Sequence, residues 1–435
     1  GDVKSESTSA SASDGSSVMS EVKIPEGFKQ TEVGIIPKDW EVEPLKSLLK
    51  EPPKYGINAA AVPLTGNLPV YIRITDISED GYYSPEKVVG VNNPFSSSYI
   101  LNEGDIVLAR TGASVGKSYL YRKEDGTLIY AGFLIKVSPD KRLLNSKYLH
   151  QYLKTEQYWA WVIVNSMRSG QPGINGNEYG RLLIPLPSIE EQTAIATALS
   201  DVDELIQSLE KLIAKKEVIK TGTMQQLLTG KTRLPEFATH DDGSPKGFKQ
   251  TELGRIPEDW DLVELRDLLS YEQPTKYIIN GNEFLEDGTT PILTAGKSFI
   301  LGYTEETHGI YRNLPTIIFD DFTTATQFVN FPFKVKSSAM KILKPKSTSV
   351  PIQLIYLLLS NIDYKVGDHK RHWISEFSSL KVRLPNSSIE QTAIATVLSD
   401  MDTEIQVLQQ RLEKTKDIKQ GMMQQLLTGK LRLAH

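Results

Sequence analysis

The sequence predicts an α+β protein in which two β-rich domains are separated by two long helices that form an antiparallel coiled coil. The first observation is a short repeat, GFKQTEVGIIPKDWEVEPLKSLL from Gly27 and GFKQTELGRIPEDWDLVELRDLL from Gly247, with 14 of 23 positions identical. The second is a 43-residue repeat that begins at Gln192 and again at Gln391, with 27 identical positions. The third is that the segments between these repeats differ in sequence. A duplicated frame around unlike inserts predicts a pseudo-two-fold internal duplication.

The repeats divide the chain into five parts. The Ser-rich start cannot bury a core, so we expect a disordered tail or a remnant of cloning there. The predicted parts are this tail over 1–20, a first β-rich domain over 21–187, a first helical region over 188–234, a second domain over 235–385 and a second helical region over 386–435.

The long repeat has the pattern of a coiled coil, because its apolar residues follow one another in steps of three and four. Ser188 and Ser388 are expected to cap the two helices, and Gly230 and Gly429 to end them. A lone helix of this length would be poorly stable, so we expect the two copies to bury their apolar stripes against each other. The predicted seam comprises Ile195, Leu199, Val202, Ile206, Leu209 and Ile213, with Ile394, Leu398, Met401, Ile405, Leu408 and Leu412.

Each insert is predicted to be β-rich, then helical, and to end in a polar loop and a short strand before a proline. The first contains alternating stretches such as GDIVLAR and SYLYRKEDG, and the second contains PTIIFDD and AMKILKP. The two inserts therefore share a plan without sharing residues. This favours two recognition modules of one fold with different specificities.

Composition excludes several classes of function. The net charge of −5 leaves only a local patch for nucleic acid, and the absence of cysteine removes disulfides and thiolate metal sites. Apolar runs are too short for a membrane span. The stretch TGASVGKS, which begins at Thr111, resembles a phosphate-binding loop but has the wrong glycine spacing and is followed by a predicted strand. Neither a catalytic constellation nor a metal site is expected.

The polar loops carry the groups that proteins use on DNA: cations and amides for base edges, hydroxyls for phosphates. In the first insert these candidates are Arg73, Arg110, Thr111, Ser114, Lys117, Arg168, Ser169, Gln171 and Asn175. In the second they are Lys276, Lys297, Thr323, Thr324, Thr326, Lys370, Arg371 and His372. Any one of them alone could equally be a solvated loop residue.

The duplicated GFKQTE…IP.DW motif, the loop GDIVLARTGASVGK and the helix ending in QQLLTGK.RL resemble the DNA-specificity subunit of Type I restriction–modification systems. The resemblance covers about Ile24 to Leu433. It implies a cytoplasmic, non-catalytic subunit whose two target-recognition domains each read one half of an asymmetric, split DNA site. It also implies that the helices act as a ruler and as the dock for two methyltransferase subunits, through which restriction subunits join. S-adenosylmethionine, ATP and Mg²⁺ would belong to those partners.

Some polar positions of the helices match between the repeats although a packed seam does not require it. An outside partner could read them, so the candidates for a subunit interface are Gln192, Gln225, Gln226, Gln391, Gln424 and Gln425. Two other classes of function remain open on the residues alone. A stand-alone methyltransferase or nuclease would bind S-adenosylmethionine or a metal by itself, and a coiled-coil scaffold would show no sequence preference on DNA.

Overall fold

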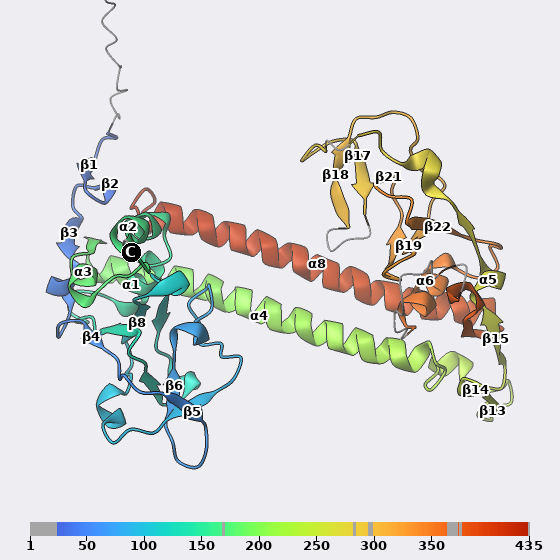
Figure 1. Cartoon of the computed structure of the whole chain (residues 1–435), viewed down its shortest axis with the longest axis horizontal. Helices are drawn as coiled ribbons and strands as arrows, with labels where there is room; N and C mark the ends of the chain where they lie inside the picture. The colour runs from blue at the N-terminus through green and yellow to red at the C-terminus, as the bar shows by residue number, and fades with distance from the viewer. Residues whose placement is uncertain are drawn as a thin grey trace, which may run out of the picture. The chain divides into compact units, whose positions relative to one another are not determined.

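The computed structural model describes residues 24–167, 170–281, 284–294, 299–362, 373 and 376–433. It divides into two compact units. The described residues up to Gln207 and those from Lys414 onward form the first unit, and Ser208–Glu413 form the second. Each unit therefore contains a β-rich domain together with parts of both long helices, α4 (Ile189–Leu227) and α8 (Ser388–Leu426) (Figure 1).

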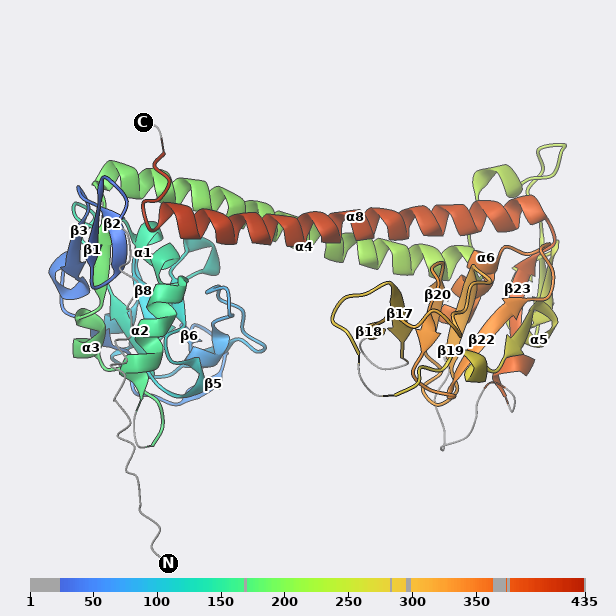
Figure 2. The ribbon, with the colours of Figure 1, turned by 90° about the horizontal axis from the view of Figure 1, so that it is seen from above.

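The first unit begins with the duplicated frame and continues into two sheets. Its frame is the hairpin β1 (Phe28–Thr31)–β2 (Gly34–Pro37) and the pair β3 (Glu41–Pro44)–β12 (Leu183–Leu186). One sheet has the order β4 (Lys54–Tyr55), β11 (Leu134–Val137), β8 (Ile106–Ala109), β9 (Ser118–Leu120). The other has the order β10 (Leu128–Tyr130), β6 (Val70–Ile72), β7 (Val89–Val91), β5 (Ala61–Pro63). The helices α1 (Ser146–Tyr152), α2 (Glu156–Ser166) and α3 (Gly176–Gly180) complete it (Figure 2).

The second unit repeats this order with different residues. Its frame is the hairpin β13 (Phe248–Thr251)–β14 (Gly254–Pro257) and the pair β15 (Trp260–Glu264)–β23 (Lys381–Pro385). One sheet has the order β16 (Leu269–Glu272), β22 (Met340–Pro345), β19 (Thr316–Asp320), β20 (Thr326–Val329). The other has the order β18 (Ile300–Thr304), β17 (Thr290–Leu293), β21 (Lys334–Val335). Its short helices with described bounds are α5 (Leu265–Leu268) and α6 (Ile352–Ser360).

The two inserts therefore share a topology. In each, two antiparallel strands (β8 and β9, or β19 and β20) form a hairpin whose first strand also pairs with β11 or β22. In each, one strand of the other sheet has one parallel and one antiparallel neighbour: β10 and β7 lie beside β6, and β21 and β18 lie beside β17. The common plan expected from the sequence is thus confirmed as one fold with two sets of side chains.

The long helices pack antiparallel within each unit. In the first, Lys419 Nζ of α8 lies 2.7 Å from Asp203 Oδ1 of α4. In the second, Lys216 Nζ of α4 lies 2.7 Å from Glu404 Oε1, and Lys220 pairs with Asp402. Partner numbers fall along α8 as they rise along α4, so the helices run in opposite directions. Ion pairs also explain why the apolar seam is interrupted at the two lysines of α4.

The apolar side chains of the predicted seam are buried or half-buried, and Ile195, Leu199, Ile394 and Leu398 pack into the cores of the adjacent domains. Eight are buried: Ile195, Leu199, Leu209, Ile213, Ile394, Leu398, Ile405 and Leu412. The other four are half-buried: Val202, Ile206, Met401 and Leu408. Burial of large aliphatic side chains stabilises each by roughly 1.5–3 kcal/mol, which accounts for two long helices that propensity alone would not hold.

The helix ends differ in one place from expectation. Ser188 caps α4, because its Oγ accepts a hydrogen bond from Glu191 N at 3.3 Å. For α8 the expectation of Ser388 was wrong: Ser387 Oγ accepts from Glu390 N at 3.4 Å, and Ser388 is already helical. The following glycine turns are as expected, since Gly230 and Gly429 have φ of +70° and +68°.

Each frame is held by the same set of ion pairs, called a clamp below. In each clamp, the arginine comes from the other repeat. Arg432, which follows α8, donates to Asp39 Oδ2 at 3.0 Å and to Glu191 Oε2 at 2.7 Å in the first frame. Glu191 also accepts from Trp40 Nε1 at 3.2 Å. In the second frame Arg233, which follows α4, binds Asp259 and Glu390 at 2.8 and 2.9 Å. These contacts explain why the DW and TGK.RL motifs occur in both copies.

Candidate nucleic-acid interface

In the first unit, two polar loops predicted from separate parts of the sequence lie side by side. The loop after β8 and the segment 170–175 are joined by backbone bonds: Gly112 N donates to Pro172 O at 3.0 Å, and Ile174 N donates to Arg110 O at 2.9 Å. Gln171 is exposed beside Gly112. A surface formed by two loops on a packed sheet is the usual position for a recognition site.

Arg110 is the cation best placed for recognition in this cluster. Its guanidinium carbon lies 4.8 Å from the centre of the Tyr55 ring, a cation–π contact that holds its plane. Tyr55 is itself fixed, because its hydroxyl accepts a hydrogen bond from Gly176 N at 3.0 Å. Phe133 is exposed next to Arg110, whose N–H donates to Phe133 O at 3.1 Å. Sequence reasoning missed both aromatic residues; an aromatic in a Gly-containing loop was the available signal.

Three other predicted residues have local partners in the structure. Arg73 forms a bidentate pair with Asp76, with Nε and Nη2 at 3.0 and 2.7 Å from its oxygens. Lys117 Nζ lies 2.6 Å from Glu79 Oε1. Asn175 caps α3, since its Oδ1 accepts from Glu178 N at 3.0 Å. These groups already carry structural roles, so they are weaker candidates for DNA than Arg110 and Gln171.

The Gly-rich loop is a packed turn between strands. Thr111 precedes a single 3₁₀ turn, η4 (Gly112–Ser114), and the chain then enters β9 directly. Gly116 has a φ of +91°, and a Cβ at this position would lie 2.8 Å from Val162 of α2. Tyr158 of α2 donates to Gly116 O at 2.7 Å. The glycines therefore serve close packing, and with no helix after the loop the geometry of a nucleotide cradle is missing here.

In the second unit, the predicted hydroxyl cluster lies at the tip of the β19–β20 hairpin. Thr323 donates its Oγ1 proton to Asp320 Oδ1 at 2.9 Å, and Thr326 Oγ1 lies 3.4 Å from Ser360 Oγ of α6. Thr324 has a φ of +60° and is half-buried. Beside them Phe322 is exposed, a residue that sequence reasoning missed.

Two further candidates, Lys276 and Ser114, are among the described residues. Lys276 is exposed on η7 (Pro274–Tyr277), which contacts β21 and β22. Ser114 is half-buried in η4. The other predicted contacts lie outside the described residues: Arg168, Ser169, Lys297, Lys370, Arg371 and His372.

The matched glutamines fall into two groups. Gln192 is buried, its Oε1 accepts from Asn145 N at 2.9 Å, and its Nε2 donates to Leu143 O and Pro187 O. Gln391 is also buried and donates to Pro385 O at 2.7 Å. These two tie a domain to its helix, so they are weaker candidates for a subunit interface than the exposed glutamines. Exposed on the helices are Gln225, Gln226, Gln424 and Gln425.

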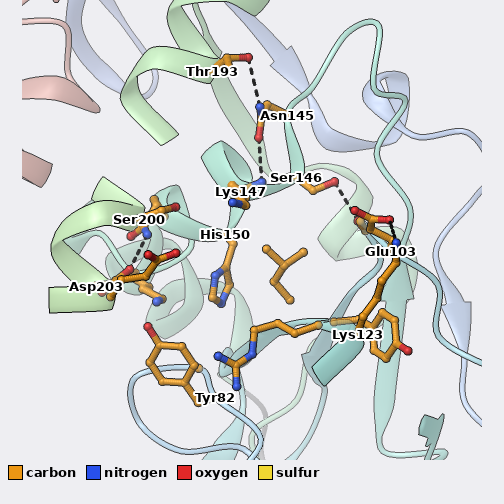
Figure 3. Close-up of a pocket in the computed structure, with 18 of the residues that line it drawn as sticks. Tyr82, Glu103, Lys123, Asn145, Ser146, Lys147, His150, Thr193, Ser200 and Asp203 are labelled. Carbon is orange, nitrogen blue, oxygen red and sulfur yellow. Dashed lines mark hydrogen bonds and ion pairs between the residues drawn. The ribbon is translucent and has the colours of Figure 1, made fainter. Parts of the chain in front are cut away.

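A cavity of about 760 Å³ lies in the first unit between α1 and α4 (Figure 3). His150 of α1 and Asp203 of α4 line it, and Asp203 Oδ2 accepts from Gln151 Nε2 at 2.7 Å. Burial lowers the pKa of His150 well below its usual value, and the nearby Lys154 and Lys419 lower it further. Burial likewise lowers the pKa of Lys154 to about 8. The cavity is thus lined by polar side chains, and the hydrogen bond between Gln151 and Asp203 links the domain to α4.

Among the described residues no group of three or more His, Cys, Asp or Glu side chains is arranged to hold a metal ion. In the same part of the chain no helix is long and apolar enough to cross a membrane. Adjacent acidic residues such as Asp320 and Asp321 could suggest a catalytic site. Asp321 Oδ2 lies 3.1 Å from Lys341 Nζ, and both of these side chains are buried, so the ion pair is part of the interior.

Comparisons with known proteins agree with this architecture. The pattern of the Type I restriction modification DNA specificity domain matches residues 37–220 and 257–416. The putative type I restriction enzyme MjaX specificity subunit of Methanocaldococcus jannaschii is 29% identical over 94% of this chain and 97% of its own. The EcoR124I/EcoR124II specificity subunit of Escherichia coli is 43% identical, over 33% of this chain and 36% of its own.

A solved structure shares the fold. The S subunit of the Type I restriction–modification system from M. genitalium superposes with a TM-score of 0.60 at 16% identity, covering 93% of this chain and 98% of that one. Two β-rich domains on a duplicated frame, two antiparallel helices and a pattern match over both inserts lead to one conclusion: this chain belongs to the family of Type I restriction–modification DNA-specificity subunits.

Proposed function

We propose that each β-rich domain reads one half of an asymmetric, split DNA sequence. The observation that carries this proposal is the pair of equivalent hairpins, β8–β9 and β19–β20, which have the same topology and different tip residues. Equal folds with unequal side chains present different donors, acceptors and apolar groups to the major groove, so they select different bases. The chain itself is not an enzyme.

The long helices act in this proposal as a ruler between the two half-sites and as the dock for two methyltransferase subunits, through which restriction subunits join. The exposed glutamines near the C-terminal ends of α4 and α8 are the matched positions that a partner could read. S-adenosylmethionine, ATP and Mg²⁺ bind to those partners, in the cytoplasm. The net charge of −5 is compatible with DNA binding because partner subunits can supply part of the phosphate neutralisation.

The test is to express this chain with its methyltransferase subunit in a host without DNA methylation and to map modified bases across the genome. We expect one motif with two short, unlike halves separated by a fixed gap. Absence of modification from a purified, assembled complex supplied with S-adenosylmethionine would leave the scaffold interpretation. Binding of S-adenosylmethionine by the chain alone, measured by calorimetry, would instead revive the enzyme interpretation.

A further inference from the structure

The two hairpin tips can be aligned residue by residue through their hydrogen bonds. In the first unit Ala109 N donates to Lys117 O at 2.8 Å, and Gly116 N donates to Ala109 O at 3.0 Å. In the second unit Asp320 N donates to Ala325 O at 2.9 Å, and Thr324 N donates to Asp320 O at 2.9 Å. These bonds make Asp320 the counterpart of Ala109. They also make Thr324 the counterpart of Gly116.

This alignment places Asp321 where the first unit has Arg110. The carboxylate is not available to a ligand, because Lys341 Nζ of β22 lies 3.1 Å from Asp321 Oδ2 and Asp321 Oδ1 accepts from Trp373 N at 3.2 Å. Both members of the ion pair are buried. The second hairpin therefore has no cation at the position of Arg110, and the charge of its Asp321 is balanced by the buried Lys341.

The second tip is also shorter and held by its own side chains. One oxygen of Asp320 accepts from Phe322 N at 3.0 Å, from Thr323 N at 2.6 Å and from Thr323 Oγ1 at 2.9 Å. Asp320 itself is buried.

Thr324 adopts a backbone conformation that β-branched residues rarely take, with φ of +60°. Among the described residues it is the one non-glycine residue with a positive φ. Strain of this kind persists where the surroundings impose it, and such positions gather at recognition sites.

The exposed face of the tip is an aromatic ring beside hydroxyls. Phe322 is 48% exposed, and Thr323 is exposed next to it. Residues 321–325 contain no cation. In the major groove, apolar side chains contact the C5-methyl group of thymine, whereas guanine is typically read by Arg or Lys. The chemistry of this tip therefore matches an A·T pair.

We propose that Phe322, presented by the Asp320-locked turn, is a specificity-determining residue of the second domain and contacts the thymine methyl of an A·T pair in the second half-site. The proposal rests on the proposed function of the chain. It adds that the two domains use the same hairpin with opposite chemistry, a guanidinium in the first and an aromatic ring in the second.

The experiment compares the modified-base maps of assembled complexes that carry the wild-type chain, Phe322→Ala or Phe322→Leu. For Phe322→Ala we expect about a tenfold or greater loss of modification at cognate sites, on the scale of one good base contact. Relaxed preference should appear at one A·T position of the second half only. Phe322→Leu keeps an apolar group and should retain part of the preference.

Matched controls separate recognition from folding. Phe248→Ala removes an aromatic of the same unit that is 45% exposed but lies in β13, and it should leave both half-sites unchanged. Thr324→Gly removes the strain and should keep the motif with an equal or higher melting temperature. Asp320→Ala should loosen the tip and weaken preference at the same position as Phe322→Ala.

The outcomes distinguish this proposal from the function on which it rests. If the wild-type complex gives a split motif and Phe322→Ala leaves its second half intact, this proposal is refuted and the function stands. A change confined to the first half, or to a G·C position of the second, would also refute it. If the wild-type complex gives no split motif, both fall together.

Discussion

At the scale of single residues, the contacts separate groups that hold the fold from groups that remain available. Arg73 and Arg110 illustrate this, because both looked equally suited to DNA in the sequence. Arg73 is committed to the buried Asp76, whereas Arg110 is stacked on Tyr55 at the junction of two loops. No sequence pattern distinguishes these two states, since the partner of Arg110 comes from another strand. Sequence therefore predicts the kind of residue in the site, and packing decides which one serves.

This contrast gives a first prediction. Arg110→Ala should weaken binding of the assembled complex to its cognate DNA by about 1–3 kcal/mol, the value of one bidentate base contact, with an unchanged melting temperature. Arg73→Ala should do the reverse, lowering thermal stability because the Asp76 carboxylate would be left buried without its partner. Fluorescence anisotropy with cognate duplex and a thermal melt measure the two effects. Equal affinity of the Arg110→Ala complex would remove this residue from the interface.

A second residue-scale prediction concerns His150, which burial keeps neutral in the folded chain. The pKa of the His150 ring is lowered in the folded chain. In the unfolded chain the ring has a pKa of about 6.5, so below that pH it binds a proton that it does not bind in the folded chain. This contribution to stability is fully present above about pH 6.5 and is lost as the pH falls below it, by up to about 1.4 kcal/mol per pH unit. Urea unfolding between about pH 7.5 and about pH 5.5 measures the slope. His150→Gln should flatten it.

At the scale of elements, the long helices were the most predictable part of the molecule. A seven-residue apolar period and a glycine stop need no knowledge of the partner, so α4 and α8 follow from the sequence nearly to the residue. The misplaced cap at Ser388 shows the limit, because adjacent serines leave the choice to backbone geometry. The strands are shorter than the apolar patterns indicate: in the stretch LPVYIRITDIS, which begins at Leu68, only Val70–Ile72 is a strand before the chain turns into the 3₁₀ helix η2 (Ile74–Asp76). There the buried Asp76 side chain accepts a hydrogen bond from Arg73 N at 2.8 Å, in place of a strand partner.

The polar pairs of the coil give a prediction with an internal control. Asp203 and Asp402 occupy equivalent repeat positions, and so do their partners Lys419 and Lys220. Asp203 is 12% exposed and also bound by Gln151, whereas Asp402 is 46% exposed. Asp203→Ala should therefore lower the free energy of unfolding by on the order of 3 kcal/mol, and Asp402→Ala by about 0.5 kcal/mol.

Chemical denaturation of the two variants measures this difference. A double variant that exchanges the charges, Asp203→Lys with Lys419→Asp, should recover part of the loss, because the pair is restored in reverse. Similar small losses at both positions would show that burial of the first pair contributes nothing. Loss without any recovery in the exchanged variant would assign the effect to Gln151 instead.

At the scale of the whole molecule, the duplication is held together by exchange of arginines between the repeats. Arg432 lies beyond the second helix and closes the first frame, while Arg233 lies beyond the first helix and closes the second. Removal of Arg233 would leave the carboxylate of Glu390, 1% exposed, without its cation, which typically costs about 3–5 kcal/mol. Loss of Arg233 should therefore reduce protection of backbone amides from hydrogen exchange in the second frame, which the arginine contacts. The first frame, which belongs to the same repeat as Arg233, should keep its protection.

Hydrogen exchange followed by mass spectrometry tests this cross-pairing. Arg233→Ala should speed exchange in β13–β15 and in the first turns of α8, and leave β1–β3 protected as in the wild type. Arg432→Ala should produce the complementary pattern, in β1–β3 and the first turns of α4, with a smaller effect because Arg432 is 43% exposed and more screened. If either variant loosened the frame of its own repeat instead, the exchange of arginines would be wrong. Uniform loosening of both frames would mean that the duplicated halves unfold as one cooperative unit and that each clamp stabilises the whole chain.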